Sequence, residues 1–188
     1  MDEAIVYLEK KISPKSSAAL DFALATMYYQ KGRLTRSEQS YSSALLKFPS
    51  FLRAHKNLGF VKLGLGNYEE AASSLSKSIS LGEGDGVTYV ALGYCYYVLE
   101  QFVSAENAYR MGILLFPESK DARNGLVNCL LETSRFPEAL ALLNELLKKE
   151  PENVFCHRAR ASALQGLGKE KDATVALETL RRMGNLNN

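Results

Sequence analysis

The chain has 188 residues and a formal net charge of +2, from 23 Lys and Arg against 21 Asp and Glu. This balance gives no bulk electrostatic reason to expect binding to nucleic acid or to an anionic membrane surface. Hydrophobic residues make up 46% and charged residues 23%, which is typical of a folded globular chain and not of a disordered one. No uninterrupted apolar run reaches the roughly 18 residues that a membrane-spanning helix needs, so membrane insertion is not expected.

Small residues and prolines recur along the chain with a period of 34 residues. The clearest series are Pro49, Pro117 and Pro151; Ala71, Ala105, Ala139 and Ala173; and Gly32, Gly66 and Gly168. A fixed period of this length is typical of proteins in which one supersecondary unit stacks on the next. A single unit has too little apolar surface to fold alone, so the stacking of units must supply the core.

In chain order, residues 1–17 are expected to hold the second helix of an incomplete leading repeat, which Pro14 ends. Five units follow, over residues 18–51, 52–85, 86–119, 120–153 and 154–187, and together they make one continuous domain. Each unit is predicted to contain two antiparallel helices. In the unit 52–85, a stripe with helical spacing around Leu58 precedes a Gly66-Asn67 turn, and a second stripe begins at Tyr68.

One joint departs from this pattern, because the unit 52–85 has Glu83, within the segment LGEGDG, where proline is expected. The glycines favour a flexible joint, or else a helix C-cap followed by Asp85 as the N-cap of the next helix. We favour the second interpretation. A phosphate-binding loop is not indicated, because no Lys-Ser or Lys-Thr pair follows the glycines.

The pattern L-G-x-x-Y…A-x-x-x-Y…P resembles the tetratricopeptide repeat, whose period is 34 residues. The unit 86–119 carries this pattern most fully, at Leu92-Gly93, Tyr96, Phe102, Ala105, Tyr109 and Pro117. The resemblance covers nearly the whole chain. It implies an all-α fold, namely a right-handed superhelical solenoid of antiparallel helix-turn-helix repeats.

The residues that most often carry chemistry fall into packing positions of the repeat. His55 and His157 lie three periods apart in the same slot, so they are expected to pack and not to share a metal. Cys95 and Cys129 share an apolar slot, and Cys156 has no partner nearby in sequence. No nucleophile with an evident base and no metal-binding motif appears. We therefore expect a protein that is not an enzyme and that needs no cofactor or metal. The odd number of cysteines weakly favours a reducing compartment, and hence a cytoplasmic location.

A second row of side chains lies beside the core row on the first helix of each unit. In proteins that resemble this one, positions 2, 5, 9, 12 and 13 of each unit line the concave face of the superhelix. By this resemblance the groove is aromatic over the first three units and polar over the last two. The residues expected to contact a partner are Phe22, Tyr29, Arg53, Lys56, Phe60, Tyr94, Tyr97, Asn124, Asn128 and Arg158. The alternative is that some of these aromatic side chains pack between neighbouring helices.

The resemblance implies a protein–protein interaction module that binds a peptide or helix of a partner in its concave groove, in a scaffolding or complex-assembly role. Some family members hold a C-terminal carboxylate with a Lys and an Asn one turn apart in the first repeat. Phe22 and Thr26 occupy those positions here. We therefore expect a segment with apolar anchors, and an acidic residue near Arg53 and Lys56.

Two alternatives stay open at the level of sequence. The chain is a homo-oligomerising structural segment whose uncapped ends associate, or it is the regulatory repeat domain of a larger enzyme. A solenoid needs polar or capped ends, and Leu180 and Met183 in the last helix are the residues expected to be uncovered. The chain is also expected to be an excised part of a longer repeat protein. Nucleic-acid binding is not expected, because Lys and Arg form no continuous stripe.

Overall fold

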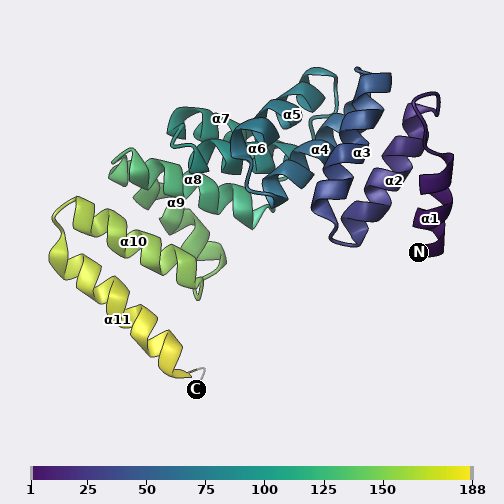
Figure 1. The fold of residues 1–188 in the computed structure, drawn as a ribbon. Helices are drawn as coiled ribbons and strands as arrows, with labels where there is room; N and C mark the ends of the chain where they lie inside the picture. Colours follow the sequence, from purple (N-terminus) through teal and green to yellow (C-terminus); the bar gives the residue numbers. More distant parts are fainter. Residues whose placement is uncertain (1, 187–188) are drawn as a thin grey trace.

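The computed structural model describes residues 2–186, which form eleven α-helices and no strand. The helices are α1 (Asp2–Lys11), α2 (Ala18–Gln30), α3 (Leu34–Lys47), α4 (Leu52–Gly64), α5 (Tyr68–Ser80), α6 (Gly86–Val98), α7 (Phe102–Leu115), α8 (Lys120–Glu132), α9 (Phe136–Lys149), α10 (Val154–Gly166) and α11 (Glu170–Leu186). Figure 1 shows them following one another along a curved stack, with α1 and α11 at its opposite ends. Over these residues, no helix combines the length and apolar character needed to cross a membrane.

The helices form antiparallel pairs, which confirms the predicted all-α repeat fold. The pairs are α2 with α3, α4 with α5, α6 with α7, α8 with α9, and α10 with α11, and α1 packs against α2. The first helices of the pairs begin at residues 18, 52, 86, 120 and 154, so consecutive units are offset by 34 residues. Each unit buries its apolar stripe against the next one, as expected for a solenoid.

The turn between the two helices of every unit passes through the left-handed region of the backbone. Gly32, Gly66 and Gly168 have φ values of 69°, 81° and 70° at this slot. Glu100 and Ser134 occupy the same slot in the other two units, with φ values of 57° and 56°. Only glycine adopts this conformation without a steric penalty, so two of the five turns are strained.

The segment LGEGDG forms two ordinary helix caps, which confirms the capping interpretation. Gly82 follows α5 with a φ of 100°, in the conformation that commonly ends a helix. Asp85 caps α6, because its carboxylate accepts hydrogen bonds from the backbone N–H of Thr88 at 2.8 Å and from the Thr88 hydroxyl at 2.6 Å.

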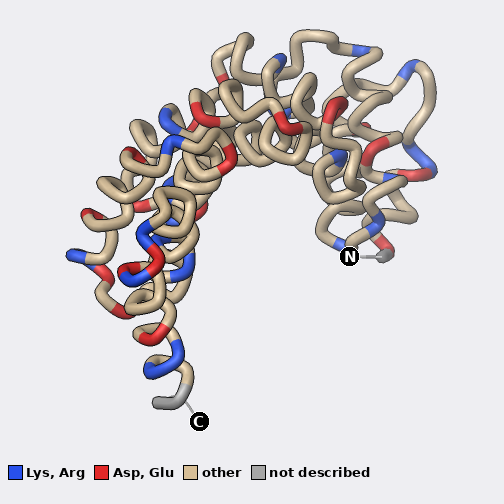
Figure 2. Tube along the Cα trace, turned by 90° about the vertical axis from the view of Figure 1, so that its left-hand side faces the viewer, with Lys and Arg blue, Asp and Glu red and all other residues tan. Residues whose placement is uncertain are grey.

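The stack is curved, and its first helices lie on the inner side. Within residues 2–186, each first helix contacts the first helix of the next unit; for example, α4 contacts α6, and α6 contacts α8. Over the same residues, consecutive second helices make no such contact. Elements on the inside of a bend are closer together than those on the outside. The first helices therefore line the concave face of the arch that Figure 2 shows from the side.

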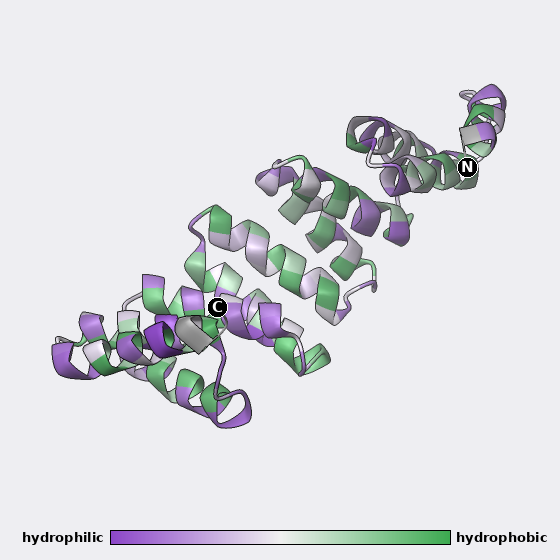
Figure 3. Ribbon diagram, turned by 90° about the horizontal axis from the view of Figure 1, so that it is seen from below, coloured by the Kyte–Doolittle hydropathy of each residue, from purple (hydrophilic) through white to green (hydrophobic). Residues whose placement is uncertain are grey.

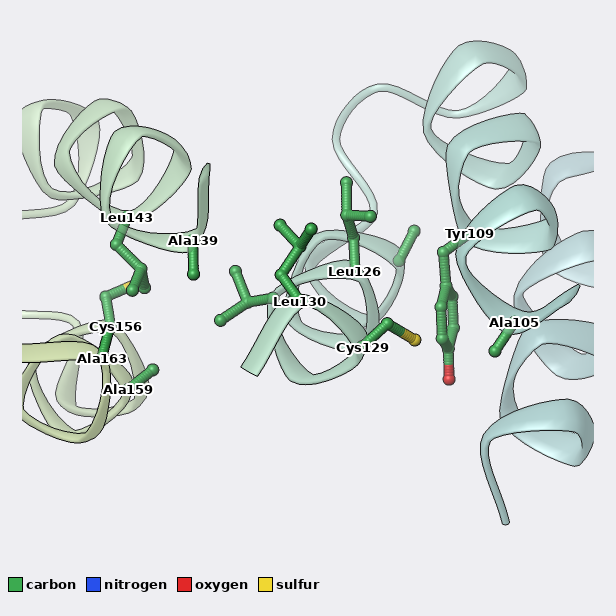
Figure 4. Packing of buried hydrophobic residues seen from close by; sticks show 12 residues of the cluster. Ala105, Tyr109, Leu126, Cys129, Leu130, Ala139, Leu143, Cys156, Ala159 and Ala163 are labelled. Carbon is green, nitrogen blue, oxygen red and sulfur yellow. The ribbon is translucent and has the colours of Figure 1, made fainter. Parts of the chain in front are cut away.

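The core is a chain of separate clusters. The largest joins α7, α8, α9 and α10, and Figure 4 shows Tyr109, Cys129, Leu143 and Cys156 within it. Figure 3 shows apolar and polar residues alternating along the helices instead of gathering in separate regions of the fold. The three cysteines are buried and free, and burial was predicted for the slot that Cys95 and Cys129 share. Each part of the chain is thus stabilised mainly by its neighbours.

The last helix corrects one expectation from the sequence. Leu180 and Met183 are half-buried, whereas Val175 and Leu177 are the exposed apolar residues of α11. Leu180 and Met183 follow Ala173 at helical spacing, and Ala173 is buried in the cluster that α10 and α11 share. Val175, two residues after Ala173, lies on the opposite side of the helix.

Candidate functional site

The concave face holds a pocket of about 390 Å³, which we call the central pocket. Its walls come from three consecutive first helices, α4, α6 and α8, and its floor comes from the second helix α7. The lining residues are Phe60, Leu63, Val87, Val90, Ala91, Tyr94, Tyr109, Asp121, Asn124, Gly125 and Asn128. A hollow with a mostly apolar lining and a few polar groups is the usual form of a binding site.

The two sides of the central pocket differ in polarity. The side formed by α6 is apolar, and the side formed by α8 carries a carboxylate and two amides. The residues of the two sides occupy the same four positions of neighbouring units: Val87, Val90, Ala91 and Tyr94 on α6, and Asp121, Asn124, Gly125 and Asn128 on α8. A helix presents positions i, i+3, i+4 and i+7 on one face, so each set forms a continuous strip.

The floor of the central pocket is the buried ring of Tyr109. Gly93 and Gly125 lie on either side of this ring, so the backbones of α6 and α8 pack directly against it. Burial raises the pKa of the Tyr109 hydroxyl above its ordinary value, and the nearby Cys129 thiol adds to the effect. The hydroxyl therefore keeps its proton over the physiological range and is available as a hydrogen-bond donor.

A smaller pocket of about 260 Å³ lies between the first two units, and we call it the N-terminal pocket. Its lining residues are Thr26, Tyr29, Gln30, Tyr41, Asn57 and Phe60. Phe60 lines both pockets, so the two hollows are adjacent on the concave face.

Five of the ten residues expected to contact a partner line these pockets. Phe60, Tyr94, Asn124 and Asn128 lie in the central pocket. Tyr29 lies in the N-terminal pocket, beside Phe60. Tyr29 is 46% exposed and Tyr94 is 44% exposed, so both rings offer free surface to a partner.

Two other aromatic residues of this set are half-buried and contact side chains of neighbouring helices, as the alternative interpretation describes. The ring of Phe22 stacks on Phe51, with the ring centroids 4.8 Å apart. Tyr97 donates its hydroxyl to the Glu132 carboxylate at 3.2 Å, and its ring meets the edge of Phe102 at 5.7 Å. Neither Phe22 nor Tyr97 lines a pocket of the concave face.

The three basic residues of the set lie outside both pockets. Lys56 forms an ion pair with Asp85, with 2.6 Å between its Nζ and the carboxylate. Arg53 and Arg158 are exposed. The charged group that does line the central pocket is the Asp121 carboxylate, which the sequence places on the concave face of the fourth unit.

Tyr109 is the site residue that could not be found from the concave positions, because it belongs to a second helix. A signal was nevertheless present in the sequence. Gly93 and Gly125 are small residues in two successive first helices, and such gaps allow a side chain from behind to reach the groove.

The remaining candidates for chemistry are engaged in structural contacts. The imidazole Nε2 atoms of His55 and His157 bond to the carbonyl oxygens of Pro49 and Pro151, at 2.8 Å and 2.7 Å, so both rings tie the start of a first helix to the preceding turn. Among residues 2–186, no group of three or more His, Cys, Asp or Glu side chains could hold a metal ion.

The fold defines a helical repeat protein whose concave face carries two adjacent pockets. Two family models, both described as tetratricopeptide repeat, match residues 17–85 and 113–167. The chain therefore belongs to the tetratricopeptide repeat proteins, a family that mediates interactions between proteins and is typically not enzymatic.

Relatives and solved structures agree with this assignment. The chain is 28% identical over 149 residues to tetratricopeptide repeat-containing protein trd-1 of Caenorhabditis elegans, covering 79% of the chain and 18% of that protein. It is 25% identical over 133 residues to an Hsp70-Hsp90 organising protein of Plasmodium falciparum, covering 69% of the chain and 52% of that protein. The chain thus spans between about a fifth and about half of the length of these relatives.

The crystal structure of YrrB, described as a tetratricopeptide repeat protein with an unusual peptide-binding site, has the same fold as this chain. The two structures superimpose with a TM-score of 0.84 over 96% of this chain and 92% of YrrB. Their sequences are 19% identical, so the likeness concerns the fold alone.

Proposed function

We propose that this chain is a protein–protein interaction module that holds a segment of a partner on its concave face and seats a large apolar side chain of that segment in the central pocket. The observation that carries the proposal is the apolar side of the pocket, where the exposed ring of Tyr94 lies beside Val87 and Val90. Aromatic side chains at the centre of an interface supply much of its binding energy. Such a module would serve in a scaffold or in the assembly of a complex.

The comparisons support a peptide or helix as the ligand. The chemical character of that ligand is inferred from the residues of this chain. YrrB is described as binding peptides, and the Plasmodium falciparum relative is named for organising Hsp70 and Hsp90. In this chain, Phe22 packs on Phe51, and the hydroxyl of Thr26 bonds to Tyr41. The first unit therefore lacks the lysine and asparagine pair that holds a C-terminal carboxylate in some family members. We assign binding to the apolar side of the central pocket instead.

The proposal is tested with a display library of random 12-residue peptides, selected on the immobilised chain. Val87→Asp places a charge on the apolar side of the central pocket, where Val87 is exposed. We expect it to weaken the selected peptides by about tenfold or more, because a carboxylate in an apolar contact must be desolvated.

Val175→Asp on α11 is the matched control, since Val175 is also exposed and lines neither pocket. It should leave binding unchanged. Peptides that bind Val87→Asp as tightly as the parent chain would move the binding site away from the central pocket. Circular dichroism of both variants shows that the helices are retained.

Self-association is a second candidate, and apolar side chains outside the pockets favour it. Leu46 at the end of α3, and Val103 and Leu114 on α7, are 85%, 71% and 70% exposed. Large exposed apolar side chains of this kind often mark contacts between proteins. Sedimentation at increasing concentration tests the candidate, with Leu114→Lys expected to abolish any dimer. A constant monomer mass would reject it.

A further inference from the structure

We infer that the central pocket selects a partner segment with a basic residue, arginine in preference to lysine, next to its apolar anchor. This inference rests on the proposed function, since it names the chemistry of the ligand for the same pocket. Three features support it: the unbalanced carboxylate of Asp121, the amides beside it, and the open hydroxyl of Tyr109 on the floor.

Asp121, in the first turn of α8, gives the polar side of the pocket a negative charge that no basic side chain of the described residues pairs with. It is exposed, lines the pocket, and forms no ion pair with any other described residue. No lysine or arginine lines the pocket. An ionised carboxylate accepts hydrogen bonds and donates none, so the fitting ligand group is a donor with positive charge.

The basic residues close to Asp121 in the sequence are held elsewhere, and so is Lys56 on α4. Lys120 forms an ion pair with Glu150 at 2.9 Å, and Lys56 is paired with Asp85 at 2.6 Å. Arg123, two residues after Asp121, donates from its guanidinium to the backbone carbonyl of Glu118 at 3.0 Å. The charge of Asp121 therefore remains for a partner. This polarity is opposite to the sequence-based expectation of an acidic ligand residue near Arg53 and Lys56.

The amides of Asn124 and Asn128 extend the polar strip beyond Asp121. Both line the pocket at i+3 and i+7 from Asp121, and their side-chain carbonyl oxygens can accept hydrogen bonds. An arginine offers five N–H donors in a planar fork, and a lysine offers three from a single point. One guanidinium can therefore serve the carboxylate and an amide together.

The hydroxyl of Tyr109 is the third feature, and comparison with Tyr41 shows why it is open. Tyr41 occupies the same slot two units earlier, and its hydroxyl bonds to Thr26 Oγ1 at 2.9 Å and accepts from Asn57 Nδ2 at 3.0 Å. Two periods later, Tyr94 stands in place of Thr26 and Gly125 in place of Asn57.

Tyr109 thus loses both partners that satisfy Tyr41. Its side chain is only 3% exposed and lines the central pocket, and none of the hydrogen bonds among the described residues involves its hydroxyl. The hydroxyl oxygen is not among the buried atoms that lack a partner, so it is accessible from the pocket and can bond to a ligand. The replacement of an asparagine by Gly125 therefore leaves the hydroxyl open to the pocket.

An arginine beside an apolar residue matches the two sides of the pocket. The methylene groups of its side chain can lie along the apolar side, against Val90 and Leu63, while the guanidinium reaches the polar side. The exposed ring of Tyr94 can stack against a guanidinium as well. An acidic segment would place like charges together at Asp121.

The same library of random 12-residue peptides tests the inference, selected in parallel on the parent chain, Asp121→Asn and Asp121→Lys. On the parent chain we expect enrichment of arginine or lysine within a few positions of a large apolar residue. Asp121→Asn should weaken the selected peptides by about fivefold, the upper value for an exposed ion pair. Asp121→Lys should replace the basic residues by aspartate and glutamate.

Two further variants separate specific effects from general ones. Asp172→Lys makes the same charge change in the first turn of α11, outside both pockets, and should leave the selection unchanged. Tyr109→Phe removes one oxygen, and we expect it to weaken the arginine-containing peptides by about threefold. Unchanged binding by Tyr109→Phe would overturn the role of the hydroxyl.

The outcomes distinguish the inference from the proposed function. Peptides without basic enrichment, or with the same enrichment on Asp121→Lys, would overturn the inference, whereas loss of binding in Val87→Asp would still support the pocket. A library that yields no peptide sensitive to Val87→Asp would reject the proposed function, and the inference with it.

Discussion

Gly125 of α8 lies directly over the ring of Tyr109 of α7, so closely that a Cβ atom on Gly125 would stand 2.3 Å from Cζ of that ring. On the other face, a Cβ atom on Gly93 would stand 2.8 Å from Cδ1 of the same ring. The tyrosine is thus clamped between two first helices. It sets their spacing, and with it the width of the central pocket.

Gly125→Ala is therefore expected to destabilise the protein by about 2 kcal/mol. The added methyl group must displace a ring that has no free space on its other side, and this cost exceeds the gain in helix propensity. Urea unfolding followed by circular dichroism measures the change.

Gly184→Ala in α11 is the matched control, because nothing lies within 4 Å of a Cβ atom at that position. It should be neutral or stabilising by up to about 1 kcal/mol. Replacing the ring as well, in Gly125→Ala with Tyr109→Leu, should recover part of the loss. A double variant less stable than the sum of the single changes would contradict the clash.

The strained turns predict substitutions that stabilise the protein, in contrast to Gly125→Ala. Glu100→Gly and Ser134→Gly should each stabilise the protein by about 1 kcal/mol, because both residues have positive φ values where glycine carries no steric penalty. The shift in the urea midpoint measures the gain. Gly66→Ser, the reverse change in an equivalent turn, should cost a similar amount, and an unchanged midpoint in all three variants would show that these turns carry no strain.

An ion-pair network between units gives a pH-dependent prediction. Burial raises the pKa of Glu106, but hydrogen bonds from Arg110 and Arg135 outweigh this and hold the pKa below its ordinary value. Arg135 of the loop before α9 lies 2.5 Å from Glu106 of α7. Because the pKa is lower in the folded state, the stabilisation is complete above the ordinary glutamate value and is lost as the pH falls through the lowered one.

Glu106→Gln should accordingly cost about 1 kcal/mol at pH 7, and the difference from the parent chain should shrink at pH 3. Urea unfolding at the two pH values measures it. Glu145→Gln, an exposed change on α9, should have no effect at either pH. A pH-independent difference for Glu106→Gln would mean that packing, and not charge, is responsible.

The buried thiols give a fourth prediction. Burial raises the pKa of Cys95 and of Cys129 to about 11, and it also raises the pKa of Cys156. The thiolate is the reactive form, so the three thiols should react with a disulfide reagent roughly a hundredfold more slowly in the native protein than after unfolding in urea. Ser73→Cys, at an exposed position of α5, should add one fast thiol. A fast thiol in the native parent chain would show that a core cluster opens.

The fold could be predicted from the sequence because equivalent positions of every repeat meet the same packing requirement. Proline, alanine and glycine recur in fixed slots, and each slot has one steric role. The helix caps around Gly82 and Asp85 were predictable for a different reason, because these residue types suit only a few backbone conformations.

The candidate site was predictable only in part, because a position on the concave face does not determine what a side chain contacts there. Lys56 and Tyr97 occupy concave positions, yet one is paired with Asp85 and the other bonds to Glu132. These contacts depend on which partner the adjacent unit supplies. Tyr109 reaches the pocket from behind through two glycines, which no rule about first helices describes.

The direct approach between consecutive first helices, and its absence between second helices, has a mechanical consequence. When the curvature of the stack changes, the contacts between first helices keep their spacing nearly constant, so the distance between consecutive second helices changes most. The central pocket spans three of these first helices, α4, α6 and α8. A ligand that contacts all three helices would hold them at fixed relative positions, and its binding would set the local curvature of the superhelix.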